Sequence, residues 1–244
     1  MPASLSTSYC GPAPIPEDLW GRWNFDPWLI AVMMIAAVLF ALRPATSRER
    51  LYFSTAMAFL VVAFISPLCA LTVALFSARV VHHVLLVALA APLLALALGG
   101  RRWVLGPLLM PLVMLHTVVF WLWHSPDAYV MALSNTPVYW LMQITLLGTA
   151  MAMWAAIFRA SPARAIAALL FLTIQMGLLG ALLVFAGAPL YTPHFATTLA
   201  FGLEPQSDQQ LAGLIMWVPA SLPYIGVGLA RLLMMLRAPW EQRA

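Results

Sequence analysis

The sequence predicts an all-α fold, a polytopic membrane protein built as a bundle of seven transmembrane helices. Hydrophobic residues make up 64% of the 244 positions and charged residues only 8%, which is too little charge to cover the surface of a soluble domain of this size. The second observation is an asymmetry of charge. The arginines gather in loops on one side of the predicted bundle, whereas all five histidines fall toward the other side.

Seven segments are apolar over roughly the 20 residues that a helix needs to cross a bilayer. In chain order they span residues 27–42, 51–71, 76–98, 104–123, 137–158, 165–186 and 211–236. The first of them is short. The last contains Pro219 and Pro223, and we expect these prolines to bend or break its helix. Broken transmembrane helices often line a cavity.

Orientation follows from the basic residues, because loops on the cytoplasmic side of a membrane carry their excess. The chain contains no lysine, and ten of its twelve basic residues lie in the first, third and fifth loops or near the C-terminus: Arg43, Arg48, Arg50, Arg101, Arg102, Arg159, Arg164, Arg231, Arg237 and Arg243. The predicted topology therefore has the N-terminus outside and the C-terminus inside.

This topology divides the chain into three parts. Residues 1–26 form an outer-face segment, and Trp20, Trp23 and the nearby Trp28 are expected to serve as interfacial anchors. Residues 27–237 form the bundle, and residues 238–244 form a cytoplasmic tail. We attribute the net charge of +4 to arginines that face anionic lipid headgroups, so the expected partner of this charge is the lipid bilayer and not nucleic acid.

The two cysteines, Cys10 and Cys69, both fall on the predicted outer side, in the N-terminal segment and at the end of the second helix. An outer compartment permits a disulfide, which would require Cα atoms within about 7 Å of each other. Their wide separation in the sequence gives no indication of such closeness. We therefore favour two unrelated thiols over a disulfide or a shared metal site.

Ionisable side chains at membrane depth are costly, and they generally face the bundle interior or a water-filled cavity. Eight residues meet this description: Arg79, His82, His83, His116, His124, Asp127, His194 and Asp208. At the start of the third helix, Arg79 shares a helix face with both following histidines. These histidines point about 100° apart, so one can face the core while the other faces a neighbouring helix. The cation favours neutral imidazole, the form that binds metal, but it also repels a metal cation.

Two further positions on the predicted helices are informative. His124 closes the fourth helix, and His116 lies eight residues earlier, about 12 Å deeper, so the two cannot ligate one ion together. For His116 we favour a buried histidine that is hydrogen-bonded to a carbonyl or hydroxyl. Asp208 is predicted at the outer N-terminus of the seventh helix, where a carboxylate can cap free N–H groups. An ion pair between Asp208 and Arg79 is the alternative.

The 14 methionines, Met176 and Met216 among them, are spread over several helices. Thioethers are soft ligands that suit Cu(I). Methionine is also ordinary apolar filling, and filling is the interpretation that we favour.

Several motifs occur in order along the chain: Phe25-Asp26-Pro27, Ser66-Pro67-Leu68, Phe76-Ser77-Ala78 with His83, Ala91-Pro92-Leu93-Leu94, Trp123-His124-Ser125-Pro126, Ala132-Leu133-Ser134-Asn135, and Asp208-Gln209-Gln210-Leu211-Ala212-Gly213 with its continuation to Pro219. With these motifs the chain resembles the seven-helix CtaG-type cytochrome c oxidase assembly factors, the class associated with caa(3) oxidases. The last motif is the most specific of them.

The chain departs from this family at two places. The family typically opens its third helix with two histidines four residues apart, whereas this chain has Arg79 and His83, with His82 where a glutamine is usual. The family also tends to carry histidines early in the fifth helix, where this chain has Tyr139 and Gln143. The lost histidines weaken the expectation that this member ligates metal directly.

The resemblance implies a non-enzymatic assembly factor for a bacterial cytochrome c oxidase, located as a multi-pass protein in the plasma (inner) membrane. Its implied role is to aid copper delivery or insertion at the outer face, with oxidase subunits or a copper chaperone as partners. The candidate metal ligands are His83, His124 and Asp208, joined by His82 and His194.

Two other functions stay open. A metal-free membrane scaffold would hold nascent oxidase or a copper chaperone, and it would keep working after His83 and His124 are replaced together. A small-solute or metal transporter, or an intramembrane enzyme, is the third alternative. It is disfavoured because the sequence shows no internal repeat, no Ser/His dyad and no zinc-binding pair of histidines on one helix turn.

Overall fold

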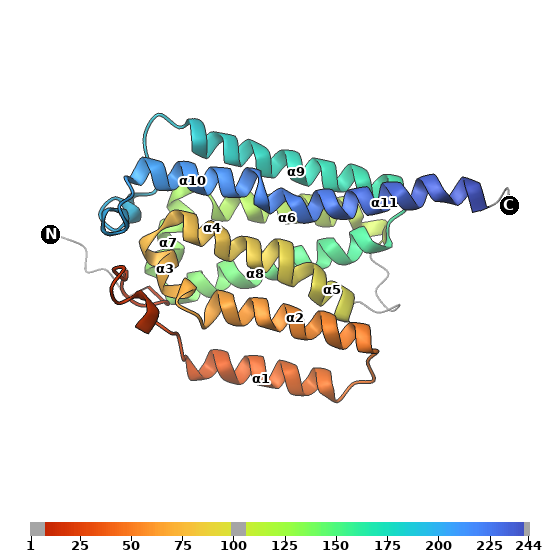
Figure 1. Cartoon of the computed structure of the whole chain (residues 1–244), viewed down its shortest axis with the longest axis horizontal. Coiled ribbons are helices and arrows are strands. Elements are labelled where there is room, and N and C mark those ends of the chain that lie inside the picture. Colours follow the sequence, from red (N-terminus) through yellow and green to blue (C-terminus); the bar gives the residue numbers. More distant parts are fainter. Residues whose placement is uncertain (1–7, 99–105, 242–244) are drawn as a thin grey trace.

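The computed structural model describes residues 8–98 and 106–241, and within those residues every regular element is helical. The predicted all-α class is therefore confirmed. Long helices lie side by side, and the chain runs back and forth between two ends of the bundle (Figure 1). Arg101, Arg102, Arg243 and the start of the predicted fourth span at residues 104–105 lie outside the described residues.

The α-helices, in chain order, are α1 Pro27–Ala41, α2 Ser47–Phe64, α3 Leu68–Ala74, α4 Phe76–Val84, α5 Ala91–Leu98, α6 Leu109–Trp123, α7 Pro126–Ser134, α8 Thr136–Arg159, α9 Pro162–Phe185, α10 Pro205–Trp217 and α11 Leu222–Glu241. A π-helix, η2 Leu85–Ala90, joins α4 to α5. Short 3-10 turns complete the fold: η1 Leu19–Gly21, η3 Gly106–Leu108, η4 Thr192–His194, η5 Thr198–Phe201 and η6 Pro219–Ser221.

Four helical stretches are long and apolar enough to cross a membrane: Phe76–Leu98, Thr136–Arg159, Pro162–Phe185 and Pro205–Arg237. The pair α2 and α3 would make a fifth span, and α1 and α6 are apolar but shorter. The described residues thus form a multi-pass membrane protein with four or five spans by length and composition. The count of seven stays a prediction.

Helix starts follow capping signals that are visible in the sequence. Asp26 caps α1 and accepts a hydrogen bond of 2.7 Å from the Tyr9 hydroxyl, which holds the pKa of this carboxyl below its usual range. Thr46 and Glu49 form a reciprocal capping box on α2, and Asn135 caps α8. Each of these side chains satisfies backbone N–H groups that have no partner within the first turn.

Two predicted helices are interrupted, and both interruptions coincide with proline. The predicted span 51–71 is divided at Ser66 and Pro67, where α2 and α3 meet at a bend of 44°. The expected break in the last helix is confirmed at Pro219, where η6 separates α10 from α11. Pro223 lies in the first turn of α11, where a missing N–H costs little.

The expectation of two unrelated thiols is wrong, because Cys10 and Cys69 form a disulfide with Cα atoms 5.4 Å apart. The N-terminal segment crosses the end of α2 before α1 begins, and Asn24 holds it there. The backbone N–H of Asn24 donates to the carbonyl of Ile65, and its side-chain amide donates to the carbonyl of Phe64. This contact places the segment that carries Cys10 beside the end of α2, close to Cys69.

Figure 1 shows the N-terminal segment, α3, α7 and the loop between α9 and α10 gathered at one end of the bundle, which we call the disulfide end. The C-terminus lies at the opposite end. Much of the buried core is contributed by α4 and α8, whose buried side chains include Phe76, Tyr139 and Trp154. The polar residues selected from the sequence are buried mainly near the disulfide end.

Candidate functional site

Asp208 on α10 caps the N-terminus of α4. Its carboxylate accepts hydrogen bonds from the backbone N–H of Phe76 at 2.7 Å and of Ser77 at 3.3 Å, and from the Ser77 hydroxyl. The N-cap of its own helix is Glu204. The prediction that Asp208 caps its own helix is therefore wrong, since the free N–H groups that it satisfies belong to a different helix. Both of its oxygens are engaged, and the side chain is buried.

The glutamines around Asp208 satisfy the carboxyl end of α9. The side-chain amides of Gln206, Gln209 and Gln210 donate to the carbonyls of Ala186, Leu183 and Val184. The other amide atom of Gln209 accepts a hydrogen bond from the backbone of Leu190. The most specific sequence motif thus joins α10 to α4 at one side and to α9 at the other, and its polar residues are explained by helix ends.

Arg79 is buried in α4 with 1% of its surface exposed, and its guanidinium carbon lies 5.4 Å from the centre of the Tyr139 ring. Tyr129 and Tyr139 are its polar neighbours, and no acid among the described residues forms an ion pair with it. The suggested ion pair with Asp208 is wrong, because the described ion pairs join Arg22 to Asp18 and Arg43 to Glu49. Across residues 8–98 and 106–241, the bundle therefore encloses a cation without a paired acid.

The two neighbouring histidines of α4 point in different directions, as their spacing predicts. His83 lines a cavity between helices, whereas the ring of His82 meets the edge of Phe64 on α2, with ring centres 4.9 Å apart. Neither ring nitrogen of either residue has a hydrogen-bond partner among the described residues. A buried imidazole without partners is costly, so these two rings are candidates for a ligand.

His83 and His124 come together although they lie on different helices. Their ring centres are 5.4 Å apart, and those of His82 and His83 are 5.8 Å apart. His124 follows the last residue of α6, and its Nδ1 lies 2.7 Å from the carbonyl oxygen of Phe120. Because a carbonyl only accepts, Nδ1 carries the proton and Nε2 keeps its lone pair. That Nε2 has no partner within residues 8–98 and 106–241.

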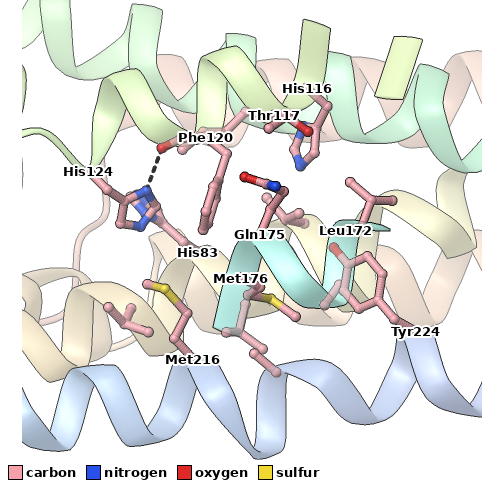
Figure 2. Close-up of a pocket in the computed structure, with 16 residues that line it drawn as sticks. His83, His116, Thr117, Phe120, His124, Leu172, Gln175, Met176, Met216 and Tyr224 are labelled. Atoms are coloured by element: carbon pink, nitrogen blue, oxygen red, sulfur yellow. Dashed lines mark hydrogen bonds between the residues drawn. The ribbon is translucent and has the colours of Figure 1, made fainter. Parts of the chain in front are cut away.

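The cavity beside this histidine pair has a volume of about 50 Å³ and is lined by α4, η2, α6, α8, α9, α10, η6 and α11. Figure 2 shows Met216 on the side of the histidine pair, and Gln175 and Met176 between that pair and Tyr224. Most of the lining is apolar. A soft cation would therefore meet imidazole nitrogen and thioether sulfur here, with Thr117, Gln175 and Tyr224 as the other polar side chains.

His116 lines the deeper part of the same cavity. Its Nδ1 lies 2.9 Å from the hydroxyl of Thr149, and that hydroxyl donates its own proton to the carbonyl of Thr145. The hydroxyl must therefore accept from His116. The expectation of a buried histidine bonded to a hydroxyl is confirmed.

His194 lies in η4, where both of its ring nitrogens are engaged. The Tyr129 hydroxyl is 2.7 Å from Nε2, and the carbonyl oxygen of Ala74 is 3.2 Å from Nδ1. Burial lowers the pKa of His194 to about 4. The residue joins the loop between α9 and α10 to α3 and α7. To bind a metal it would have to give up one of these bonds.

The predicted ligands are thus distributed over three places at the disulfide end. His83 and His124 form a pair with His82 beside them, Asp208 lies on the N-terminus of α4, and His194 lies in the loop. No three side chains of histidine, cysteine, aspartate or glutamate converge on a point that could hold a metal ion, among the residues that the structure describes. Asp127, also selected from the sequence, is exposed in the first turn of α7.

Gln175 and Tyr224 line the cavity and were not selected from the sequence, whereas Met176 and Met216 were considered as soft ligands and interpreted as filling. A signal existed for Gln175, which is an amide in an otherwise apolar helix and accepts a hydrogen bond from the Trp121 indole at 3.1 Å. For the two methionines the residue type suits both a soft metal and ordinary filling, so the sequence could not separate the two roles.

Comparison with known proteins gives one finding. Neither the curated proteins nor the solved structures contain a match to this chain. A family model does match, and it covers residues 28–238, which include every helix from α2 to α10 and the whole cavity. The chain belongs to the cytochrome c oxidase caa3 assembly factor family, Caa3_CtaG.

Proposed function

We propose that this chain is a non-enzymatic assembly factor for a bacterial cytochrome c oxidase, and that it receives copper at its disulfide end for delivery to the oxidase. Family membership supports the link to oxidase assembly. The observation that carries the copper proposal is the pair of His83 and His124, whose rings lie 5.4 Å apart with unpartnered nitrogens beside a cavity.

The chemistry of this pair suits a cargo metal. Nε2 of His124 has a lone pair because Nδ1 donates to Phe120, and a second-shell hydrogen bond of this kind orients an imidazole for metal. Binding of copper to His83 and His124 would break no hydrogen bond of the described chain. Thioether sulfur from Met216 lies in the same cavity, and soft sulfur favours Cu(I) over hard cations.

Release is as necessary as binding for a carrier. Asp208 is engaged at the N-terminus of α4 and His194 with Tyr129 and Ala74, so neither ligand strengthens the histidine pair while these bonds persist. The buried cation of Arg79 lies on the same helix one turn from His83 and repels a bound metal cation. Few ligands and a neighbouring positive charge both favour weak, reversible coordination.

The experiment is an anaerobic Cu(I) titration of detergent-purified protein with the Cys10–Cys69 disulfide intact, beside a His83→Ala/His124→Ala variant. We expect about one Cu(I) per chain in the wild type and none at the same affinity in the variant. His116→Ala is a matched control, because it removes a buried histidine of the same cavity whose Nδ1 is already bonded to Thr149. Equal binding by the wild type and the double variant would contradict the proposal.

A metal-free scaffold is the second candidate, and the buried cation of Arg79 favours it. This function predicts that cells carrying the double histidine variant still assemble active oxidase. Oxidase activity in membranes of such cells separates the two: the copper carrier loses it, and the scaffold keeps it.

We also propose the full seven-span topology, with the N-terminus outside a bacterial plasma membrane. The alternation of helix direction in Figure 1 supports it, and so does the position of Trp20 and Trp28, which are 79% and 81% exposed near the disulfide end. Exposed tryptophans suit the membrane–water interface. A reporter enzyme that is active only outside the membrane, fused to the C-terminus, should be inactive.

A further inference from the structure

The two sulfur atoms of the disulfide each face a hydrogen-bond donor. The hydroxyl of Tyr139 lies 3.7 Å from Sγ of Cys10, and because a disulfide sulfur has no proton, the hydroxyl is the donor. The side-chain amide of Asn24 lies 3.8 Å from Sγ of Cys69. Sulfur in a neutral cysteine is a weak acceptor, whereas an ionised acceptor forms much stronger hydrogen bonds. These donors therefore suit a pair of thiolates better than a disulfide.

A positive charge lies behind the same tyrosine. The guanidinium of Arg79 is 5.4 Å from the centre of the Tyr139 ring, and no acid of the described chain pairs with it. A nearby cation stabilises thiolate. Two thiolates that hold one Cu(I) carry a net charge of minus one, which is the charge that would balance Arg79. Charge complementarity thus points to the same ligand as the hydrogen-bond donors do.

We propose that Cys10 and Cys69, once reduced, hold one Cu(I) ion as a dithiolate, so that this end of the bundle has a second copper site that opens on reduction. The inference rests on the proposed function in one respect, namely that copper is the cargo. It concerns different residues from the histidine pair. Thiolate sulfur is a soft ligand that selects Cu(I).

The reaction has two steps. An external dithiol gives up two electrons and two protons and becomes a disulfide, while the disulfide of the chain takes them up and becomes two thiols. Attack falls on Cys10, since its side chain is half-buried and Cys69 is fully buried; the sulfur of Cys69 leaves as the thiolate. One Cu(I) then displaces both thiol protons and keeps its oxidation state.

Other contacts hold Cys10 in place after reduction. Its neighbour Tyr9 stacks on Tyr139 with ring centres 4.9 Å apart, and the Tyr9 hydroxyl donates to Asp26. Asn24 remains bonded to the carbonyls of Phe64 and Ile65. The two thiols therefore stay close enough to share one ion.

The test is an anaerobic titration of the full chain in detergent with Cu(I), in which a chromogenic Cu(I) chelator competes for the metal. The titration is done before reduction and again after treatment with dithiothreitol, once the dithiothreitol has been removed. We expect reduced wild-type protein to bind about one Cu(I) more than oxidised protein. Cys10→Ser/Cys69→Ser should lack this increment, and X-ray absorption at the copper edge should show additional sulfur ligands. Equal stoichiometry of the oxidised and reduced forms would overturn the inference.

The histidine variant separates this inference from the proposed function. His83→Ala/His124→Ala should retain the increment on reduction, because its cysteines are intact. If the oxidised wild type binds no copper but the increment appears, the histidine proposal fails and the dithiolate stands. If the oxidised wild type binds copper and reduction adds none, the histidine proposal stands and the dithiolate fails. Reoxidation of the reduced wild type, with return of the original stoichiometry, controls for loss of folding.

Tyr139→Phe tests the positioning role of the hydroxyl. It keeps the ring that faces Arg79 and Tyr9 but removes the donor to Cys10. A hydrogen bond to a charged group is typically worth enough to change affinity by about tenfold or more. We therefore expect Cu(I) affinity at the dithiolate to fall by about tenfold, with the histidine pair unaffected. An unchanged affinity would remove Tyr139 from the site.

Discussion

The carboxylate of Asp208 on α10 accepts hydrogen bonds from both the backbone N–H and the side-chain hydroxyl of Ser77 on α4, so a residue of one helix caps the N-terminus of another. The cap lies immediately before Arg79, His82 and His83 in α4. A carboxylate at a helix N-terminus is stabilised by the helix dipole. The position of the histidine-bearing helix therefore depends on a residue 131 positions away from Ser77 in the sequence.

Asp208→Ala should therefore lower stability by about 1–3 kcal/mol, because buried N–H groups of α4 lose their acceptor. Asp208→Asn keeps one acceptor and should cost less. Thermal unfolding in detergent measures both. Asp127→Ala is the matched control, since Asp127 is an exposed acid in the first turn of α7 and its loss should change little. Equal effects of the alanine variants at 127 and 208 would contradict the capping role.

The approach of α9 to α10 gives a second prediction. A Cβ on Gly213 would lie 2.6 Å from the carbonyl oxygen of Gly180 and 2.8 Å from a methyl of Val184. The backbone has no room to yield, so Gly213→Ala should destabilise the protein by about 1–3 kcal/mol, as overpacking does. Gly148→Ala serves as control, because a Cβ there would have no atom within 4 Å. A neutral Gly213→Ala in the same unfolding assay would show that the helices can separate.

Local signals in the sequence were enough for some helix starts, such as those predicted at residues 27 and 137, because a cap is made by residues within one turn. Asp26 and Asn135 are examples. The break at Pro219 was predictable for the same reason. The capping of α4 by Asp208 was not, because the partner helix is identified only once α10 packs beside it. The same holds for the disulfide, which depends on the path of the N-terminal segment across α2.

In the candidate site too, features set by one helix were predicted and contacts between helices were not. The different directions of His82 and His83 follow from helical geometry and were predicted correctly. Their partners come from other helices: Phe64 for His82 and His124 for His83. No spacing in the sequence contains that information. Arg79 was recognised as unusual, but that no acid among the described residues pairs with it appears only when its neighbours are in place.

Burial of His194 predicts a dependence of stability on pH. The pKa of His194 is lowered to about 4, below about 6.5 in an unfolded chain, so between these values the unfolded state binds more protons. Stability should then fall as pH decreases from about 6.5 to 4, by up to about 1.4 kcal/mol for each pH unit. His194→Gln should flatten this slope. The measurement is the unfolding temperature of both proteins from pH 7 to 4; parallel curves would exclude His194 as a contributor.

The difference between His82 and His83 gives a prediction about copper. Only His83 lines the cavity and lies against His124 at 5.4 Å, whereas His82 faces Phe64. If copper binds at the histidine pair, His83→Ala removes a ligand and should weaken Cu(I) binding at least tenfold, since even second-shell substitutions cost 10–100-fold. His82→Ala is the matched control: it removes an equally buried imidazole one position away and should leave the affinity within about threefold. Competition titration with the disulfide intact measures both variants without a contribution from thiols.

Should His82→Ala weaken binding as much as His83→Ala, the bound copper would lie between the two α4 histidines, on the α2 side of the helix and outside the cavity.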